Sequence, residues 1–209
     1  MAEGDLPSWL RPLADALPTF AADQMGRPPP NGARPAAVLV LFGDGPDLLL
    51  IERAGALRSH PGQPAFPGGA AESGDVDLRA TALREAEEEV GLDPSGVRIF
   101  GDMAPLHISV SGYAVTPILA WWRTPCAVRA VDPAEVARVA RVPIADLAHP
   151  ANRGRVRHRG WIGPSFEVGG MTVWGFTAIV IDRLLSAGGW ARPWDHGVVR
   201  DLPRVDSAS

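Results

Sequence analysis

Apolar runs separated by turn residues divide the first half of the chain into predicted strands. Residues 36–42 (AAVLVLF) and 47–52 (DLLLIE) are rich in aliphatic side chains, and a Gly-Asp-Gly-Pro turn lies between them. Short apolar runs bounded by glycine and proline are typical of strands, so this pair predicts a β-hairpin. Further strand candidates are residues 97–103, 115–122 and 137–142. Residues 155–161 predict either a strand or an arginine-rich hairpin.

Helical spacing appears at both ends of the chain and in its middle. Residues 8–22 place Trp9, Leu10, Leu13, Leu17 and Phe20 on one side of an amphipathic helix, which we expect to pack on the core or on a partner chain. Further helices are predicted at residues 78–90 and 173–186, with a short turn at 145–148. Strands interleaved with helices indicate an α/β fold with a mixed sheet covered by helices.

Proline and glycine suggest how the chain is organised. The segment GRPPPNGARP at residues 26–35 is typical of a linker. The segment after Gly188-Gly189 predicts an extended or partly disordered tail. We therefore expect an N-terminal helix and Pro-rich linker (1–33), one central domain (34–190) and a C-terminal tail (191–209).

Composition narrows the class of protein. The 209 residues are 46% hydrophobic and 21% charged with a net charge of -4, which disfavours general nucleic-acid binding and a membrane surface. All basic residues are arginine, which excludes a catalytic lysine. Cys126 is the only cysteine, no apolar run approaches the length of a membrane helix, and the acidic N-terminus lacks a signal-peptide pattern. These features predict a cytoplasmic protein without membrane segments.

The predicted helix at residues 78–90 carries the first candidate chemistry. Glu85, Glu88 and Glu89 are spaced three and four residues apart and therefore share one face. Crowded carboxylates repel one another unless a cation neutralises them, and a hard divalent cation prefers oxygen ligands. Arg84 precedes Glu88 by four residues and could hold its carboxylate. The alternative is a solvated acidic face without a ligand.

The whole stretch from Phe66 to Leu92 resembles the signature of the Nudix hydrolase family. Gly69 lies sixteen residues before Glu85, and Arg-Glu-x-x-Glu-Glu-x-Gly-Leu follows in the family's order from Arg84 to Leu92. Asp75 stands where the family usually has glutamate, and the spacer from Asp75 to Arg84 is one residue longer than usual. The resemblance covers about residues 35–187. It implies an α/β/α sandwich around a mixed β-sheet with a loop–helix–loop catalytic motif.

The resemblance also implies a metal site and a base. The implied ligands of one to three Mg²⁺ or Mn²⁺ ions are Glu85, Glu88, Glu89 and a backbone carbonyl near Gly69. The implied base is Glu135, which stands six residues before Arg141-Val142-Pro143, as a glutamate does in many family members. Glu135 could equally be a solvated loop carboxylate, and Glu88 is the alternative base.

Residues upstream of the signature resemble the coenzyme A pyrophosphatase branch of the family. The matching positions are Leu49, Leu50, Arg53, Leu57, Arg58, His60, Gly62, Phe66, Pro67, Gly68, Gly69, Glu72 and Asp75. Ile51, Ala54 and Pro64 depart from the branch's preferences for Thr, Ser and Val. Residues 174–178 (WGFTA) also resemble the closing helix of this branch. This likeness implies hydrolysis of coenzyme A to 4′-phosphopantetheine and adenosine 3′,5′-bisphosphate.

Arginines are the predicted partners of the substrate's phosphates, because a guanidinium can pair bidentately with phosphate. Arg53 and Arg58 flank the catalytic loop, and His60 either touches substrate or braces the loop. Arg155 and Arg157 belong to an alternating row that could meet a 3′-phosphate, face solvent or form a dimer contact. Competing functions are hydrolysis of another nucleoside diphosphate derivative, such as ADP-ribose, a dinucleotide or capped RNA, and nucleotide sensing without turnover. A homodimer is left open.

Overall fold

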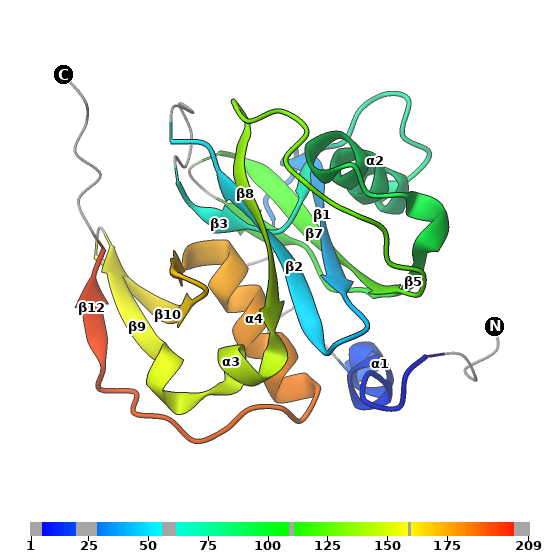
Figure 1. Cartoon of the computed structure of the whole chain (residues 1–209). Coiled ribbons are helices and arrows are strands. Elements are labelled where there is room, and N and C mark those ends of the chain that lie inside the picture. Colours follow the sequence, from blue (N-terminus) through cyan, green and yellow to red (C-terminus); the bar gives the residue numbers. More distant parts are fainter. Residues whose placement is uncertain (1–5, 20–28, 56–61, 109–110, 159, 203–209) are drawn as a thin grey trace.

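The computed structural model describes residues 6–19, 29–55, 62–108, 111–158 and 160–202, and Figure 1 shows two sheets and their helices. The first sheet follows the order β3-β2-β1-β7-β5, with β4, β6 and β8 paired at its sides. Its strands are β1 (Arg34–Phe42), β2 (Asp47–Arg53), β3 (Pro64–Ala65), β4 (Gly68–Ala70), β5 (Val97–Asp102), β6 (Leu106–Ile108), β7 (Tyr113–Trp122) and β8 (Val136–Pro143). The second sheet follows the order β11-β10-β9-β12. Its strands are β9 (Arg153–His158), β10 (Trp161–Val168), β11 (Met171–Val173) and β12 (Val199–Asp201).

The centre of the first sheet is a parallel pair. β1 runs alongside β7 in register from Arg34↔Tyr113 to Phe42↔Trp121. β2 pairs antiparallel with β1 at Phe42↔Leu48, which confirms the predicted hairpin. Parallel and antiparallel pairs coexist, so the predicted mixed sheet is also confirmed.

Helices cover both faces of this sheet. Alternate residues of a strand point to opposite faces, so Leu39 and Leu41 belong to one apolar cluster while Val40 and Phe42 belong to the other. The first cluster is closed by helix α2 (Leu78–Val90), through Ala82, Ala86 and Val90. The second is closed by α1 (Arg11–Ala16), α3 (Ile144–Ala148) and α4 (Gly175–Ala187). The result is the expected α/β/α sandwich.

The N-terminal helix packs on the core. Leu10 and Leu13 are fully buried, and the ring of Trp9 lies 6.1 Å from that of Phe42. The helix is shorter than predicted, because α1 ends at Ala16 and continues as a 3₁₀ turn at Leu17–Thr19. Proline at position 18 lacks an N–H group and disfavours continuing the α-helix. Residues 20–22 of the predicted helix lie outside the described residues.

The C-terminal segment is more ordered than expected. Trp190 packs against Trp9 and Phe42, with ring centroids 5.9 and 6.1 Å apart. β12 adds to the second sheet as a parallel neighbour of β9. The division at residues 33 and 190 stays a prediction.

Several short elements differ from the prediction. The arginine-rich segment forms a hairpin of β9 and β10, and α4 begins at Gly175 because Met171–Val173 is the strand β11. β3, β4, β6 and β11 have only two or three residues each, too few to show a period in the sequence. In the described part of the chain, no helix is long and apolar enough to cross a membrane.

Candidate active site

Helix α2 has the bounds that its sequence predicts, because both ends are capped. The side chain of Asp77 accepts a hydrogen bond from the N–H of Ala80 at 2.8 Å, which satisfies a free donor of the first turn. At the other end Gly91 adopts φ 68°, a left-handed conformation that glycine takes without strain. The helix therefore presents Glu85, Glu88 and Glu89, hereafter the glutamate face, in a fixed frame.

Glu89 is a buried carboxylate held by the glycine turn. Its side chain is buried, with 8% of the residue exposed, and Oε2 accepts a hydrogen bond from the N–H of Gly68 at 3.0 Å. Burial raises the pKa of Glu89 to about 7, although the Gly68 N–H opposes the shift, and the negative charges of Glu85 and Glu135 add to it. A Cβ at Gly68 would overlap the carbonyl of Ala37, so only glycine fits here.

Glu85 lies directly beside the next residue of the same turn. A Cβ at Gly69 would overlap the Glu85 carboxylate, which explains why this position must be glycine. The Glu85 side chain is 17% exposed, and burial raises its pKa while the guanidinium of Arg84 lowers it. Two partly desolvated carboxylates thus meet the backbone of Gly68 and Gly69. Glu88 points further out, with its side chain 59% exposed.

Arg84 joins the helix to the loop that precedes it. Its Nε and Nη2 donate to the two carboxylate oxygens of Asp75 at 3.0 and 3.1 Å, and Nη2 also donates to the carbonyl of Ala70 at 3.1 Å. Its Nη1 lies 3.1 Å from both Glu85 and Glu88. Arg84 therefore orients two members of the glutamate face from one anchored position.

Asp75 is fixed in turn by groups on both sides. Its Oδ2 accepts hydrogen bonds from the hydroxyl of Thr81 and the N–H of Glu72, each at 2.9 Å. The hydrogen bonds from Arg84 hold the pKa of Asp75 well below its ordinary value. An aspartate with the longer spacer thus reaches Arg84 in this chain.

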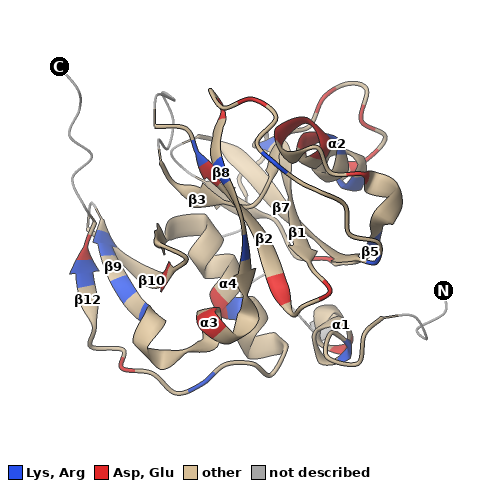
Figure 2. Ribbon diagram, viewed as in Figure 1, with Lys and Arg blue, Asp and Glu red and all other residues tan. Residues whose placement is uncertain are grey.

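The donor set of this site suits a hard divalent cation. Among the described residues no three Asp, Glu, His or Cys side chains already converge as a finished metal site. Glu85 and Glu89 nevertheless supply oxygen donors, and each raises its own pKa by being buried without a full countercharge. A bound cation would supply that countercharge, which is the chemistry that Mg²⁺ and Mn²⁺ share. The acidic residues of α2 are visible in Figure 2.

Arg53 and Glu135 reach the same site from the neighbouring strands. Arg53 ends β2 opposite Val136 of β8, and the N–H of Ala54 donates to the carbonyl of Glu135 at 2.9 Å. The charges of Arg53 and Glu135 both act on the pKa of Glu89, the first lowering it and the second raising it. The Nε of Arg53 is buried and has no hydrogen-bond partner in the described structure. This free donor is available to a ligand.

The remaining predicted substrate residues are not brought to the glutamate face. Arg58 and His60 lie outside the described residues. Arg155 and Arg157 lie on β9 of the second sheet, opposite Val199 and Asp201 of β12, and Figure 2 shows β9 well apart from α2. Arg153 of the same row has a structural role, since it is buried and pairs with Asp182.

Two contacts of this region are absent from the sequence-based prediction. The Gly68 N–H that holds Glu89 is a backbone group, and the pairing of β4 with β1 that positions it leaves no period in three residues. The hydroxyl of Thr177 on α4 donates to the carbonyl of Pro64 at 3.2 Å, across 113 residues of chain. The one available signal was that both segments resemble the same branch of the family.

Known proteins resemble this chain in sequence and fold. The NUDIX domain family matches residues 32–162. The uncharacterized Nudix hydrolase NudL of Photorhabdus laumondii is 38% identical over 186 residues, covering 82% of this chain and 95% of the relative. NudL of Citrobacter koseri is 40% identical over 185 residues, covering 82% and 92%. The structure of RenU, a Nudix hydrolase from M. smegmatis, has a TM-score of 0.55 at 19% identity and covers 78% of this chain and 91% of that one, which supports the fold alone.

The family match and the geometry of the motif agree. Nudix hydrolases cleave pyrophosphate bonds and generally need divalent metal ions. The matched region contains the glycine turn, Arg84 and the whole glutamate face. This chain belongs to the Nudix family and is a Nudix hydrolase.

Proposed function

We propose that this Nudix hydrolase cleaves the pyrophosphate bond of coenzyme A or a derivative, releasing 4′-phosphopantetheine and adenosine 3′,5′-bisphosphate. The supporting observation is that two distant segments resembling the coenzyme A branch lie against each other. Thr177 of α4 donates to the carbonyl of Pro64, and Gln63 lies beside Gly175. Segments read separately in the sequence thus form one wall of the same site.

This wall continues into the catalytic motif. The N–H of Arg53 donates to the carbonyl of Gln63 at 3.2 Å, and the charge of Arg53 acts on Glu89. A long substrate can therefore place its pyrophosphate near the glutamate face while another part lies along Gln63 and the start of α4. Coenzyme A has such an extended shape, with a pantetheine arm on one side of the pyrophosphate.

The residues have separate tasks in this proposal. Glu85, Glu89 and the backbone near Gly69 hold Mg²⁺ or Mn²⁺, which when bound polarises the phosphates and acidifies a water molecule. Arg84 keeps Glu85 and Glu88 oriented, and Arg53 pairs with a phosphate through its free Nε–H. Glu135 or Glu88 accepts the proton of the attacking water. Loss of either buried glutamate should therefore remove the reaction while leaving the fold.

A substrate panel tests the proposal. Coenzyme A, 3′-dephospho-coenzyme A, ADP-ribose and a dinucleoside polyphosphate are each incubated with Mg²⁺ or Mn²⁺, and the products are separated by chromatography. The Glu85→Gln variant, purified identically, controls for contaminating hydrolases. We expect the highest kcat/KM on coenzyme A. Faster cleavage of ADP-ribose or of the dinucleotide would overturn the coenzyme A assignment and leave the general hydrolase.

A further inference from the structure

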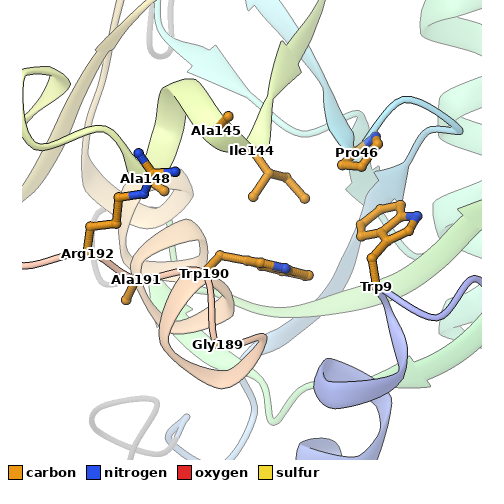
Figure 3. Close-up of a pocket in the computed structure, with 9 residues that line it drawn as sticks. All are labelled: Trp9, Pro46, Ile144, Ala145, Ala148, Gly189, Trp190, Ala191 and Arg192. Carbon is orange, nitrogen blue, oxygen red and sulfur yellow. The ribbon is translucent and has the colours of Figure 1, made fainter.

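A second cavity, of about 430 Å³, lies away from the glutamate face, and Figure 3 shows its lining. We call it the Trp190 slot; it is lined by Trp9, Pro46, Ile144, Ala145, Ala148, Gly189, Trp190, Ala191 and Arg192. Gly68 pairs with Val38 in β1, whereas Trp9 contacts Phe42 at the far end of that strand. Four residues of strand separate these points by about 13 Å. The slot is therefore not part of the hydrolytic site.

The slot is built largely by the ends of the chain. Trp9 and residues 189–192 lie outside the region 32–162 that the family matches, while Pro46 and α3 lie inside it. The N-terminal helix and the C-terminal segment thus create a cavity that the family domain would not form alone. Its volume falls in the usual range for small-molecule sites.

Its shape suits a flat apolar molecule. In Figure 3 the ring of Trp190 forms one wall, Ile144 faces it from α3, and Trp9 and Pro46 close one end. Aromatic rings favour stacked or edge-on contact with another ring, and apolar walls favour a body without polar atoms.

The polar groups of the lining are all donors at the level of side chains. Arg192 is exposed at the end opposite Trp9 and forms no ion pair with any described residue. No aspartate or glutamate lines the slot, and the indole N–H groups of Trp9 and Trp190 have no hydrogen-bond partner in the described structure. A ligand must therefore supply acceptors and, to match Arg192, a negative charge.

The nearby C-terminus of α4 does not oppose an anion. Its last carbonyls would carry partial negative charge if free. They are paired instead, because Gly188 N–H donates to Leu184 and both Trp190 and Ala191 N–H groups donate to Leu185, at 2.9 Å each. The uncompensated charge at the slot is thus the positive charge of Arg192.

We propose that the Trp190 slot binds a small aromatic carboxylate, with its ring between Trp190 and Ile144 and its carboxylate on Arg192. The occupant carries one negative charge because the slot offers one cation. The carboxylate accepts from the guanidinium, and the ring displaces water from apolar walls. The site is independent of hydrolysis and depends on α1 and Trp190 remaining docked on the core.

The test uses three probes of one shape on the full chain. 2-Naphthoate, 2-naphthalenemethanol and 2-naphthylmethylammonium share a ring and differ in charge. Binding is followed through the indole N–H signals of the ¹⁵N-labelled protein, with Trp9→Phe and Trp190→Phe used to assign them. We expect shifts centred on Trp9 and Trp190, with affinity falling from the carboxylate to the alcohol to the ammonium. Shifts elsewhere, or equal affinities for the three probes, would overturn the proposal.

Variants separate the charge from the cavity. Arg192→Gln should weaken 2-naphthoate about three- to fivefold, the scale of an exposed ion pair, and leave the alcohol unchanged. Arg129→Gln removes an exposed arginine beside the end of α2 and is the matched control. Ala145→Phe places a ring in the slot from an exposed position and should abolish binding of all probes. An Arg192→Gln variant with unchanged naphthoate affinity would refute the charge assignment even if Ala145→Phe fails to fold.

Discussion

Glu89 illustrates how a single residue can be both costly to the fold and useful to the site. It is nearly buried, accepts one hydrogen bond from Gly68, and lies near the negative charges of Glu85 and Glu135. A carboxylate in such surroundings prefers to stay protonated, so its pKa rises to about 7. A divalent cation reverses this preference, because it favours the charged form.

This balance predicts how stability depends on pH in the absence of metal. Between the ordinary pKa of 4.5 and the folded value of about 7, the folded protein retains a proton that the unfolded chain loses. Stability in EDTA should therefore fall as pH rises through this window, by up to about 3 kcal/mol at one pKa unit per 1.4 kcal/mol. Glu89→Gln should remove that fall. Urea unfolding at pH 5 and pH 8 measures it.

The matched control for this effect is Glu87→Gln, which changes an exposed glutamate of the same helix. It should keep the pH dependence of the wild type. If Glu89→Gln and the wild type lose the same stability between pH 5 and pH 8, the carboxylate of Glu89 is not the group responsible.

A second residue-scale prediction concerns turnover. Glu85→Gln or Glu89→Gln keeps the side-chain shape and removes one charged metal ligand. We expect kcat to fall at least about a hundredfold while the melting curve in EDTA remains cooperative. Steady-state kinetics with saturating Mn²⁺ measures this, again with Glu87→Gln as control. Turnover near that of the wild type would support the solvated-face alternative.

At the scale of elements, the site is the contact between the glycine turn and helix α2. The turn supplies the N–H of Gly68 and the space at Gly69, and the helix supplies two buried carboxylates. Asp75 and Arg84 hold the two together through a paired hydrogen bond. A cation bound between turn and helix would stabilise both as one unit.

Metal should accordingly raise the melting temperature. At a hundred times its Kd a ligand that binds only the folded state adds about 2.7 kcal/mol, which corresponds to roughly 5–10 °C for a chain of this size. A melting scan with Mn²⁺ or EDTA measures the shift. The shift should be larger at pH 8 than at pH 6, because a proton competes at Glu89. A double Gln variant of Glu85 and Glu89 should show none; an equal shift there would place the ion elsewhere.

Long and capped elements were predictable from the sequence, whereas contacts made by the backbone were not. Helix α2 was predicted with its observed bounds, because Asp77 and Gly91 cap it. The three residues of β4 carry no visible period, so the N–H that holds Glu89 could not be predicted. Alternation placed Arg155 and Arg157 on one face, but could not tell that β9 belongs to a second sheet. Residue spacing encodes local geometry and not which sheet a strand joins.

At the scale of the whole molecule, the chain ends complete the core on the side away from α2. Leu13 of α1 is fully buried in the cluster that contains Phe42. Leu13→Ala should cost about 2–5 kcal/mol of unfolding free energy, as other buried leucines do. Because α1 lies at the far end of β1, kcat of the folded fraction should stay unchanged. Urea unfolding and initial rates test this against Asp15→Ala, which alters an exposed residue of the same helix. A loss under about 0.5 kcal/mol would mean that α1 is only loosely docked.

The substrate spans the molecule, so its recognition is also a whole-molecule property. Coenzyme A differs from 3′-dephospho-coenzyme A by one phosphate, and the chain has only arginine to pair with it. One charge-assisted contact contributes on the order of 1.5–3 kcal/mol, or about ten- to a hundredfold in kcat/KM. We expect coenzyme A to be preferred by that factor.

Arginine variants identify the residue that makes this contact. Arg58, in the loop between β2 and β3, is the first choice, and Arg58→Gln should shrink the preference while leaving dephospho-coenzyme A hydrolysis nearly unchanged. Arg157 is the second choice, because its neighbour His158 contacts Trp174 at a ring separation of 5.0 Å, next to the start of α4. Arg123→Gln, at an exposed position just after β7, is the matched control. Equal kcat/KM values for the two substrates would show that recognition runs through the pantetheine arm, where charge plays no part.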